Sequence, residues 1–401
     1  MHRMSSGIRT ALIAGGGIAG PTAGIALTQA GIEATVYEAY QSSASGVGGA
    51  LSIAPNGLDA LDAIGAGGAV RRIGTPITSI VVQSWIGRTL AEFGTPPGMP
   101  AMQFVSRSDL YCSLAAEARS RGVRIFHGKR LIDVAENADG ITACFADGSS
   151  TEADVLIGAD GIRSTVRSLI DQAAPEPHYA GLISFGARVA HLDLPSTGGK
   201  MYMSFGRRAF FGYQVHDDAS GLWFVNLPRE KPISYAAALG RAADHWLTEL
   251  AVTFRDDRTP AAEIIKRTNP ADLLITGPVE SMPRVATWSR DRLVLIGDAA
   301  HAASSSSGQG ASLAVESAVQ LARCLRDLPY QQAFARYEEL RRKRVERIIA
   351  AAARTNSNKA AGPVARVLRD RLMPVAMKLT RPEKATWQYN HHIDWAAAAW
   401  A

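Results

Sequence analysis

The sequence is poor in cysteine and has no long apolar run. Its three cysteines, Cys112, Cys144 and Cys324, lie far apart and form no C-x-x-C pair, so neither a cysteine-ligated metal nor a redox disulfide is expected. Without a stretch of about 18 consecutive apolar residues, no membrane span is expected. The N-terminal residues lead directly into a strand without a secretion signal, and free thiols suit a reducing compartment. We therefore expect a cytoplasmic protein.

A large excess of one sign of charge is also lacking. The chain has 43 basic and 37 acidic residues, a net charge of +6 and a pI near 9.3. This excess helps to attract anionic cofactors or substrates, but it is too diffuse to predict nucleic-acid binding. The hydrophobic fraction of 47% is typical of globular proteins. A chain of 401 residues is expected to form two closely packed domains.

The sequence does contain a glycine turn between a strand and a helix, close to the N-terminus. An apolar run over residues 11–14 has strand character, and an Ala-rich helix follows over about residues 21–29. Between them Gly15, Gly17 and Gly20 stand at G-x-G-x-x-G spacing. One glycine makes the bend, one lets a pyrophosphate approach the backbone, and one lets helix and strand pack closely. Because a helix N-terminus favours phosphate, the pattern predicts a dinucleotide site.

Glu38 narrows the choice of dinucleotide. It ends a second short strand, about 20 residues beyond the turn, where a carboxylate accepts a hydrogen bond from a ribose 2′-hydroxyl. A 2′-phosphate is disfavoured there because two negative groups would meet. A glycine loop that binds nothing is the alternative, but the strand, the spacing, the helix and the acid all agree. FAD and NAD both remain compatible with this segment.

Later segments add two motifs and a sheet. Gly158-Ala159-Asp160-Gly161-Ile162-Arg163-Ser164 opens a short helix at its last residue. A buried strand over residues 292–296 ends in Gly297-Asp298-Ala299-Ala300-His301, and a helix is predicted over about residues 310–325. Residues 180–227 have strand character almost throughout and are rich in aromatic side chains. Such an aromatic sheet set against a cofactor would form a pocket for an apolar or aromatic molecule.

These motifs occur in a recognisable order. From Ile8 to about Arg347 the chain resembles the single-component FAD-dependent aromatic hydroxylases, the group similar to p-hydroxybenzoate hydroxylase. The resemblance implies an α/β fold, in which a Rossmann-like FAD-binding domain carries an inserted, mostly antiparallel β-sheet substrate domain and a C-terminal helical segment. The expected divisions are the FAD-binding domain in residues 1–76, 104–178 and 285–328, the substrate domain in a hairpin at 77–103 and in 179–284, and C-terminal helices in 329–401.

The resemblance also implies which residues hold FAD. They are Gly15, Gly17 and Gly20 at the pyrophosphate, Glu38 at the adenosine ribose, Leu131 at the adenine, Arg107 at the phosphate or ribityl region, Asp298 at a ribityl hydroxyl, Gly310 and Ala311 at the flavin pyrimidine edge, together with Ala19 and Gly49. Asp160 is implied to order the pyrophosphate region and the passage of the nicotinamide cofactor. The chemistry is consistent, because carboxylates bind hydroxyls strongly and a helix N-terminus stabilises negative charge on reduced flavin.

The activity implied by the resemblance is that of an NAD(P)H-dependent flavin monooxygenase. NADH or NADPH reduces FAD, O2 adds to the reduced flavin, and the resulting C4a-hydroperoxide hydroxylates an aromatic or polycyclic small molecule. No second G-x-G-x-x-G follows a strand, so the reductant is expected to bind transiently on the FAD domain, and the lack of a cysteine pair excludes a flavin–disulfide reductase. The alternatives are epoxidation or Baeyer–Villiger oxidation on the same fold, or a non-catalytic flavin-binding sensor. A monomer or a homodimer is expected.

No catalytic residue is assigned from the sequence. The candidates to line the substrate are Arg188, Tyr202, Phe211, Tyr213 and Trp223, with His216 as a further candidate to assist, although a plain core role explains each of them as well. Two departures from the family pattern concern the flavin region. Residues 304–307 are all serine where the family commonly has a proline, and Ser312 stands where Asn is frequent.

Overall fold

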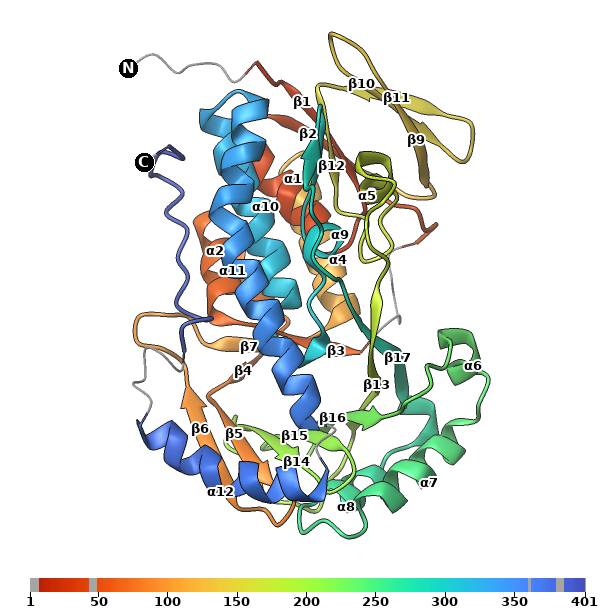
Figure 1. Cartoon of the computed structure of the whole chain (residues 1–401), viewed down its shortest axis with the longest axis vertical. Coiled ribbons are helices and arrows are strands. Elements are labelled where there is room, and N and C mark those ends of the chain that lie inside the picture. The colour runs from red at the N-terminus through yellow and green to blue at the C-terminus, as the bar shows by residue number, and fades with distance from the viewer. Residues whose placement is uncertain (1–6, 43–48, 360–361, 380–385, 401) are drawn as a thin grey trace.

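The computed structural model describes residues 7–42, 49–359, 362–379 and 386–400 and places them in two bodies, one above the other in Figure 1. The upper body, here called the dinucleotide domain, is built on a six-stranded sheet that carries the glycine turn. The lower body, the second domain, is built on a seven-stranded sheet. Among the helices described in these ranges, none is long and apolar enough to cross a membrane.

The six-stranded sheet runs in the order β18-β19-β12-β1-β2-β8. Its strands are β1 (Thr10–Ala14), β2 (Glu33–Tyr37), β8 (Arg124–Phe126), β12 (Val155–Gly158), β18 (Ser289–Arg290) and β19 (Leu293–Leu295). All neighbouring pairs are parallel except β18 and β19. The strand order reverses at β1, and ligands of such sheets bind beyond the carboxyl ends of the strands at that point. Gly15 directly follows β1, so the fold places the glycine turn there.

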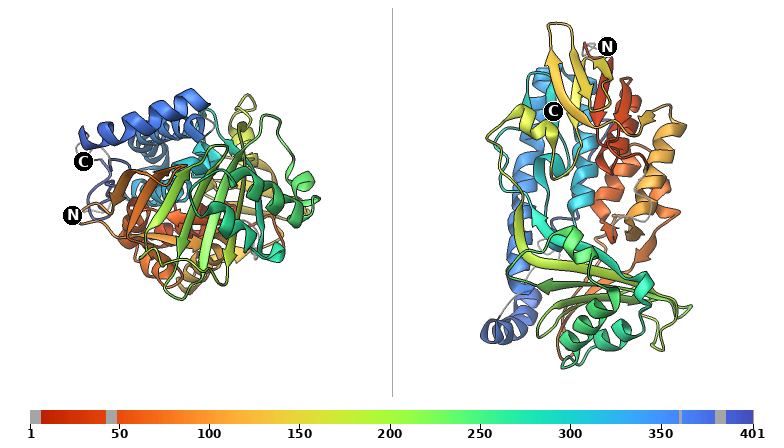
Figure 2. Two further views of the ribbon diagram at one scale, coloured as in Figure 1. Left: turned by 90° about the horizontal axis from the view of Figure 1, so that it is seen from below. Right: turned by 90° about the vertical axis from the view of Figure 1, so that its right-hand side faces the viewer.

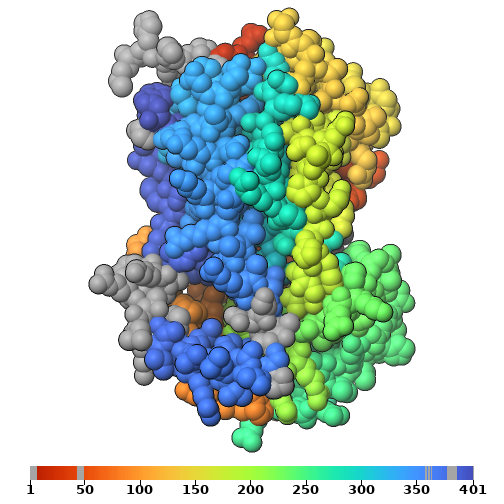
Figure 3. Space-filling view, in the orientation of Figure 1, coloured from red at the N-terminus to blue at the C-terminus, as the bar shows by residue number. Residues whose placement is uncertain are grey.

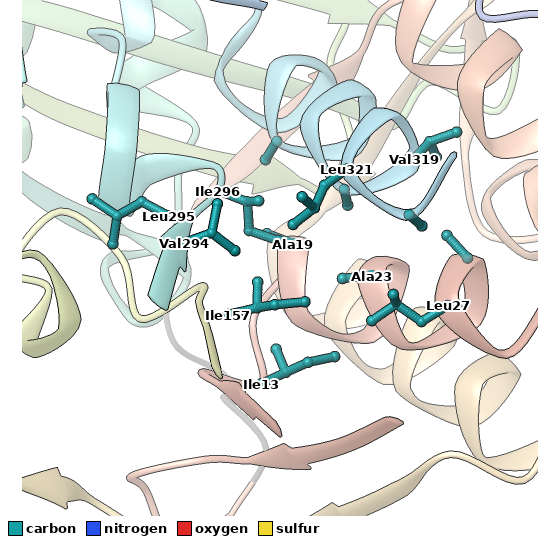
Figure 4. Close-up of a cluster of buried hydrophobic side chains, with 14 of the residues drawn as sticks. Ile13, Ala19, Ala23, Leu27, Ile157, Val294, Leu295, Ile296, Val319 and Leu321 are labelled. Carbon is teal, nitrogen blue, oxygen red and sulfur yellow. The ribbon is translucent and has the colours of Figure 1, made fainter. Parts of the chain in front are cut away.

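Helices α1 (Ala19–Gln29) and α10 (Gly310–Asp327) pack on this sheet and on each other. Figure 4 shows Ile13 and Ile157 from the strands in one buried cluster with Ala23 of α1 and Leu321 of α10. The small side chains on α1 let the two helices approach closely. The remaining helices of this domain are α2 (Pro55–Ala63), α3 (Gly67–Arg71), α4 (Arg107–Ser120), α5 (Thr165–Ile170) and α9 (Asp298–His301), with the short turn η2 (Ser305–Ser307).

The seven-stranded sheet runs in the order β17-β13-β16-β15-β14-β5-β6. Its strands are β5 (Ser79–Ser84), β6 (Thr89–Gly94), β13 (His178–Val189), β14 (Met201–Phe205), β15 (Phe210–Val215), β16 (Gly221–Pro228) and β17 (Leu274–Ser281). Only β14 and β5 pair in parallel. The face turned away from the dinucleotide domain is covered by helices, as Figure 2 shows. These are α6 (Tyr235–Leu239), α7 (Ala243–Phe254) and α8 (Ala261–Lys266), followed by η1 (Pro270–Asp272).

Two three-stranded sheets complete the strands of the described ranges. One contains β3 (Ala50–Ile53), β4 (Thr75–Ile77) and β7 (Met102–Ser106), and the other β9 (Leu131–Glu136), β10 (Ile141–Phe145) and β11 (Ser150–Ala153). The first lies at the junction of the two bodies. There Ala54 and Phe104 pack in one apolar cluster with Met201 and Leu222 of the seven-stranded sheet. This shared cluster fixes one face of the second domain against the dinucleotide domain.

The long helix α11 (Tyr330–Lys359) connects the two bodies along one side. Figure 3 shows it on the surface of the dinucleotide domain, with α12 (Pro363–Leu379) lying across the second domain. The lower end of α11 reaches β15 and β16 in Figure 1. Residues from the C-terminal region of the chain therefore come close to the sheet of the second domain.

A buried ion-pair network ties α10 to α11 and α2. Glu316 of α10 is fully buried, as is its partner Arg341 of α11. Arg344 donates to the same carboxylate at 2.8 Å and Asn56 of α2 at 2.6 Å. Burial would raise the pKa of Glu316, but the two arginines lower it to about 2. The carboxylate is therefore charged at neutral pH and fixes the N-terminal half of α10.

Candidate active site

The glycine turn is built from three glycines with three different constraints. Gly15 has a φ of +107°, and a Cβ there would lie 2.3 Å from the carbonyl oxygen of Ala159. A Cβ on Gly20 would lie 1.9 Å from the carbonyl oxygen of Gly15. At Gly17, by contrast, the nearest protein atoms would be those of the Tyr111 ring at 3.9 Å. Two glycines are thus required by the fold, whereas Gly17 leaves open space that suits a ligand.

The N-terminus of α1 lies at this turn without a capping side chain. Its N-cap residue, Ile18, makes no side-chain hydrogen bond, and the first turn contains no acidic residue. The first N–H groups of this helix are therefore available to an anion. Ala19 packs close to Gly297 and Ala314. A Cβ on Gly297 would lie only 3.1 Å from the Cβ of Ala19. The turn is thereby joined to the start of α9.

Glu38 lies at the edge of the same turn. Its carboxylate accepts hydrogen bonds from the N–H of Gly16 at 2.6 Å and of Tyr40 at 2.9 Å. The carbonyl of Glu38 accepts from the N–H of Lys129, which brings the start of β9 and the buried Leu131 close to it. The structure thus gathers the two residues predicted for the adenosine end.

A Glu38→Arg protein is expected to bind FAD at least about tenfold more weakly, because a cation cannot accept a hydrogen bond from the ribose hydroxyls. The ratio of FAD to protein after purification and titration measures this. Glu33→Arg is the matched control, since Glu33 is exposed at the other end of β2. Unchanged FAD retention in Glu38→Arg would remove Glu38 from the site.

A cation, a phenol and a carboxylate lie near one another beside the turn. The Nε of Arg107 donates to the hydroxyl of Tyr111 at 2.6 Å, and the N–H of Arg107 donates to the carbonyl of Gly49. Burial raises the pKa of Tyr111, and Arg107, Asp298 and Glu38 all act on it electrostatically. Two of the three predicted carboxylates, Glu38 and Asp298, therefore lie near the Tyr111 ring. Tyr111 itself was missed from the sequence, although it stands one helical turn after Arg107.

Asp298 begins α9 directly after Gly297. No hydrogen-bond partner of its carboxylate is seen in the described ranges, and burial raises its pKa while Arg107 opposes the shift. A carboxylate in such a place is suited to accept from a ligand hydroxyl. This open acceptor is the observation on which the fit of FAD rests, together with the open space at Gly17.

An Asp298→Asn protein is expected to be more stable without FAD but to bind FAD about tenfold more weakly. A carboxyl pKa that is higher in the folded state means that stability falls as pH rises above the ordinary carboxyl value, so removing the charge helps the FAD-free protein at neutral pH. Thermal unfolding with and without saturating FAD tests both parts. A lower melting temperature combined with unchanged FAD affinity would contradict this role.

Asp160 shapes the wall of the turn. Its carboxylate accepts from the hydroxyl of Ser164 at 2.5 Å and from the N–H of Val166 at 3.1 Å, which caps α5. The missing side chain of Gly15 leaves room for the backbone of Asp160. The structure therefore gives Asp160 a capping role, and its effect on the nicotinamide cofactor stays a prediction.

The N-terminus of α10 follows the serine-rich segment. Its N-cap residue, Gln309, makes no capping hydrogen bond, and its buried Nε2 has no partner in the described part of the chain. A Cβ on Gly310 would meet only the carbonyl of Ala303, at 3.9 Å, so this helix start is open. The contact of Gly310 and Ala311 with the flavin stays a prediction. Side chains of α11 hold the serines in place, with Asn356 donating to Ser304 and Lys359 to Ser306. Hydroxyl bonds thus fix the segment in which the family commonly has a proline.

The structure corrects the prediction of which residues of the seven-stranded sheet line the substrate. Phe211 and Trp223 pack with Trp246 and Phe254 under α7, and Tyr213 lies on the same face. Tyr202 stacks on Tyr213 with ring centroids 5.3 Å apart. These four predicted lining residues therefore belong to the core of the second domain and point away from the dinucleotide domain. His216 lies in the turn after β15, where it hydrogen-bonds to Ser220.

The opposite face of the sheet, called here the inner face, is turned to the dinucleotide domain. Because successive residues of a strand alternate, Phe210 on β15 and Phe224 and Asn226 on β16 lie on it. Phe224 fills the space above Gly212, where a Cβ would lie 2.2 Å from the ring. Arg188 is paired with Leu222 and so projects to this face, at the exposed end of β13. The sequence showed the aromatic content of the sheet but not which rings face the site.

These features together define a flavoprotein. Residues 9–352 match the family model described as "FAD binding domain", and the chain belongs to this family. It is 33% identical over 396 residues to 3-amino-4-hydroxybenzoate 2-monooxygenase PtmB3 of Streptomyces platensis, covering 94% of this chain and 95% of that protein. It is 30% identical to 6-hydroxynicotinate 3-monooxygenase of Pseudomonas fluorescens, covering 86% and 90%.

The fold agrees with solved structures of this type. Klebsiella pneumoniae HpxO complexed with FAD and uric acid superposes with a TM-score of 0.78 at 24% identity, covering 92% of this chain and 97% of that one. The protein is thus an FAD-dependent monooxygenase, a class that takes its electrons from NADH or NADPH. The expected resemblance, fold class and cofactor are confirmed.

Proposed function

We propose that this monooxygenase hydroxylates a small aromatic molecule bound between the inner face of the seven-stranded sheet and the flavin end of the dinucleotide domain. The proposal rests on one observation. The apolar cluster of the inner face includes Ala54, whose N–H donates to the hydroxyl of Ser312, two residues after Gly310. The inner face therefore meets the N-terminus of α10, where the flavin pyrimidine edge is predicted.

The cofactor and the residues around it have separate roles. Bound FAD supplies hydride acceptance and reaction with O2. The N-terminal N–H groups of α10 favour negative charge on the pyrimidine ring. Phe210, Phe224 and the methionines of β14 give the inner face an apolar surface that excludes water from the reacting ring. No residue is assigned as an acid or a base in the oxygen-transfer step.

Relatives named for different substrates support the general reaction and leave its target open. PtmB3 is named for an aminohydroxybenzoate and the Pseudomonas enzyme for a hydroxynicotinate, and both names denote a small substituted aromatic ring. Transient binding of NADH or NADPH on the dinucleotide domain, a cytoplasmic location and a monomeric or dimeric state remain predictions. Epoxidation and Baeyer–Villiger oxidation are the alternatives to hydroxylation, and the structure of the product distinguishes the three reactions.

The test is to measure NADH and NADPH oxidation by the FAD-loaded protein with a panel of hydroxybenzoates, aminobenzoates and hydroxypyridine carboxylates. We expect at least one compound to stimulate oxidation and to gain one oxygen atom from isotopically labelled O2, detected by mass spectrometry. A protein that holds FAD but oxidises neither nucleotide with any compound would be a flavin-binding sensor instead.

A further inference from the structure

Lys359 is a buried cation held between three separate parts of the chain. It is the last residue of α11 and is only 8% exposed. Its Nζ donates to the Oδ1 of Asn226 at 2.6 Å and to the hydroxyl of Ser306 at 2.8 Å. The same Nζ lies 4.1 Å from the centroid of the Phe210 ring. It therefore joins the inner face of the sheet to the serine segment that leads into α10.

None of these partners is an anion. Within the described ranges the hydrogen-bond partners of Lys359 are uncharged and it forms no ion pair, and burial alone lowers its pKa to about 7. The carbonyl end of α11 contributes only partial negative charge. A buried ammonium group is costly unless a counter-ion or a full set of hydrogen bonds compensates it. If the residue served only to anchor the helix, an uncharged side chain would avoid this cost.

The position of Nζ is fixed by its neighbours. The Nδ2 of Asn226 donates to the hydroxyl of Ser184 at 2.8 Å, so its Oδ1 is turned to Lys359. Asn226 and Phe210 lie on the inner face, and Ser306 lies between Asp298 and Gly310 along the chain. Lys359 thus occupies the edge of the space assigned to the substrate.

We propose that Lys359 is a substrate-binding residue that pairs with an oxyanion on the aromatic ring, a carboxylate or a phenolate, and so selects anionic aromatic substrates. The assignment rests on the proposed function, because it places the substrate against the inner face. The ring of Phe210 beside Nζ offers the aromatic part of such a molecule an apolar neighbour. A charge-assisted hydrogen bond in this water-poor space would discriminate strongly against a neutral analogue.

The same arrangement predicts that the affinity for an anionic substrate depends on pH. The groups that face Nζ from β15, β16 and η2 are Phe210, Asn226 and Ser306, none of which titrates. A bound anion favours the ammonium form, so affinity for an anionic ring is highest below about pH 7. It falls as pH rises through and above this value. A neutral ring has no such dependence.

The test uses the FAD-loaded enzyme titrated with benzoate and with its neutral isostere benzamide, followed by the change in flavin absorbance. Wild type is expected to bind benzoate at least about tenfold more tightly than benzamide. Lys359→Met should bring this ratio to about one while leaving benzamide affinity within about twofold, and Lys359→Arg should retain most of it. Lys343→Met, on an exposed position of the same helix, is the control and should behave as wild type. Titrations near pH 7 with a nitrophenol that is already ionised at that pH separate a phenolate preference from a carboxylate preference.

A second variant tests the charge without removing Lys359. Asn226→Asp supplies an internal counter-ion beside Nζ and should also abolish the preference for benzoate. A wild-type protein that binds the two compounds equally or binds neither, or a Lys359→Met protein that keeps the preference, would overturn the proposal. These titrations need no turnover. A protein that discriminates as expected but never oxidises NADH or NADPH would refute the proposed function and leave the role of Lys359 standing.

Discussion

A Gly17→Ala protein is expected to fold normally and to lose at least about 100-fold in FAD affinity, which corresponds to roughly 3 kcal/mol. The added methyl group meets only the Tyr111 ring, at an ordinary contact distance of 3.9 Å, so the fold accepts it. A pyrophosphate lying against the backbone at this position would not, because it needs the space that the missing side chain leaves. FAD titration and thermal unfolding of the FAD-free protein measure the two effects separately.

Two further glycine variants serve as comparisons for this prediction. Gly94→Ala adds a methyl group in open space at the end of β6, away from the turn, and should change neither FAD affinity nor stability. Gly20→Ala should damage the fold itself, since its Cβ would lie 1.9 Å from the carbonyl oxygen of Gly15. If Gly17→Ala bound FAD like wild type, the phosphates would not lie at this turn.

A Glu316→Ala protein is expected to lose about 3 to 5 kcal/mol of unfolding free energy, because it leaves Arg341 buried without its counter-ion. The wild-type pKa of about 2 lies below the ordinary glutamate value, so this contribution is complete above that ordinary value and is lost as pH falls towards 2. Denaturant unfolding at neutral and at acidic pH measures both. The difference between the two proteins should shrink as the pH is lowered.

Glu338→Ala is the control for this measurement. Glu338 pairs with Arg342 on the partly exposed side of α11, where one ion pair contributes about 1 kcal/mol or less. A loss at Glu316 no larger than that at Glu338 would show that the buried network does not hold α10 and α11 together. FAD affinity should also fall in Glu316→Ala, since the same carboxylate fixes the start of α10.

The glycine turn could be predicted from sequence because its constraints are local. The strand, the three glycines and the helix start fall within about one supersecondary unit, and Glu38 follows at the spacing of the next strand. The Gly297-Asp298 segment was found in the same way, as a strand end followed by a helix. At each of these positions the local backbone conformation restricts which residue types fit, so the residue types in the sequence indicate the conformation.

The substrate side could not be predicted because its constraints are long-range. Strand alternation says that Phe210 and Phe211 face opposite ways, but only the packing of α7 decides which of them is covered. Lys359 and Asn226 stand 133 residues apart and meet only because α11 reaches down to β16. Tyr111 was within reach, since its spacing of four from Arg107 puts both on one face of α4.

The central claim is that this chain holds FAD along the glycine turn and the start of α10. The most direct measurement is the visible absorption spectrum of the freshly purified protein, repeated after incubation with FAD and removal of the excess. We expect a yellow protein with a flavin band in the blue and about one FAD per chain. A colourless protein that takes up no FAD would contradict it.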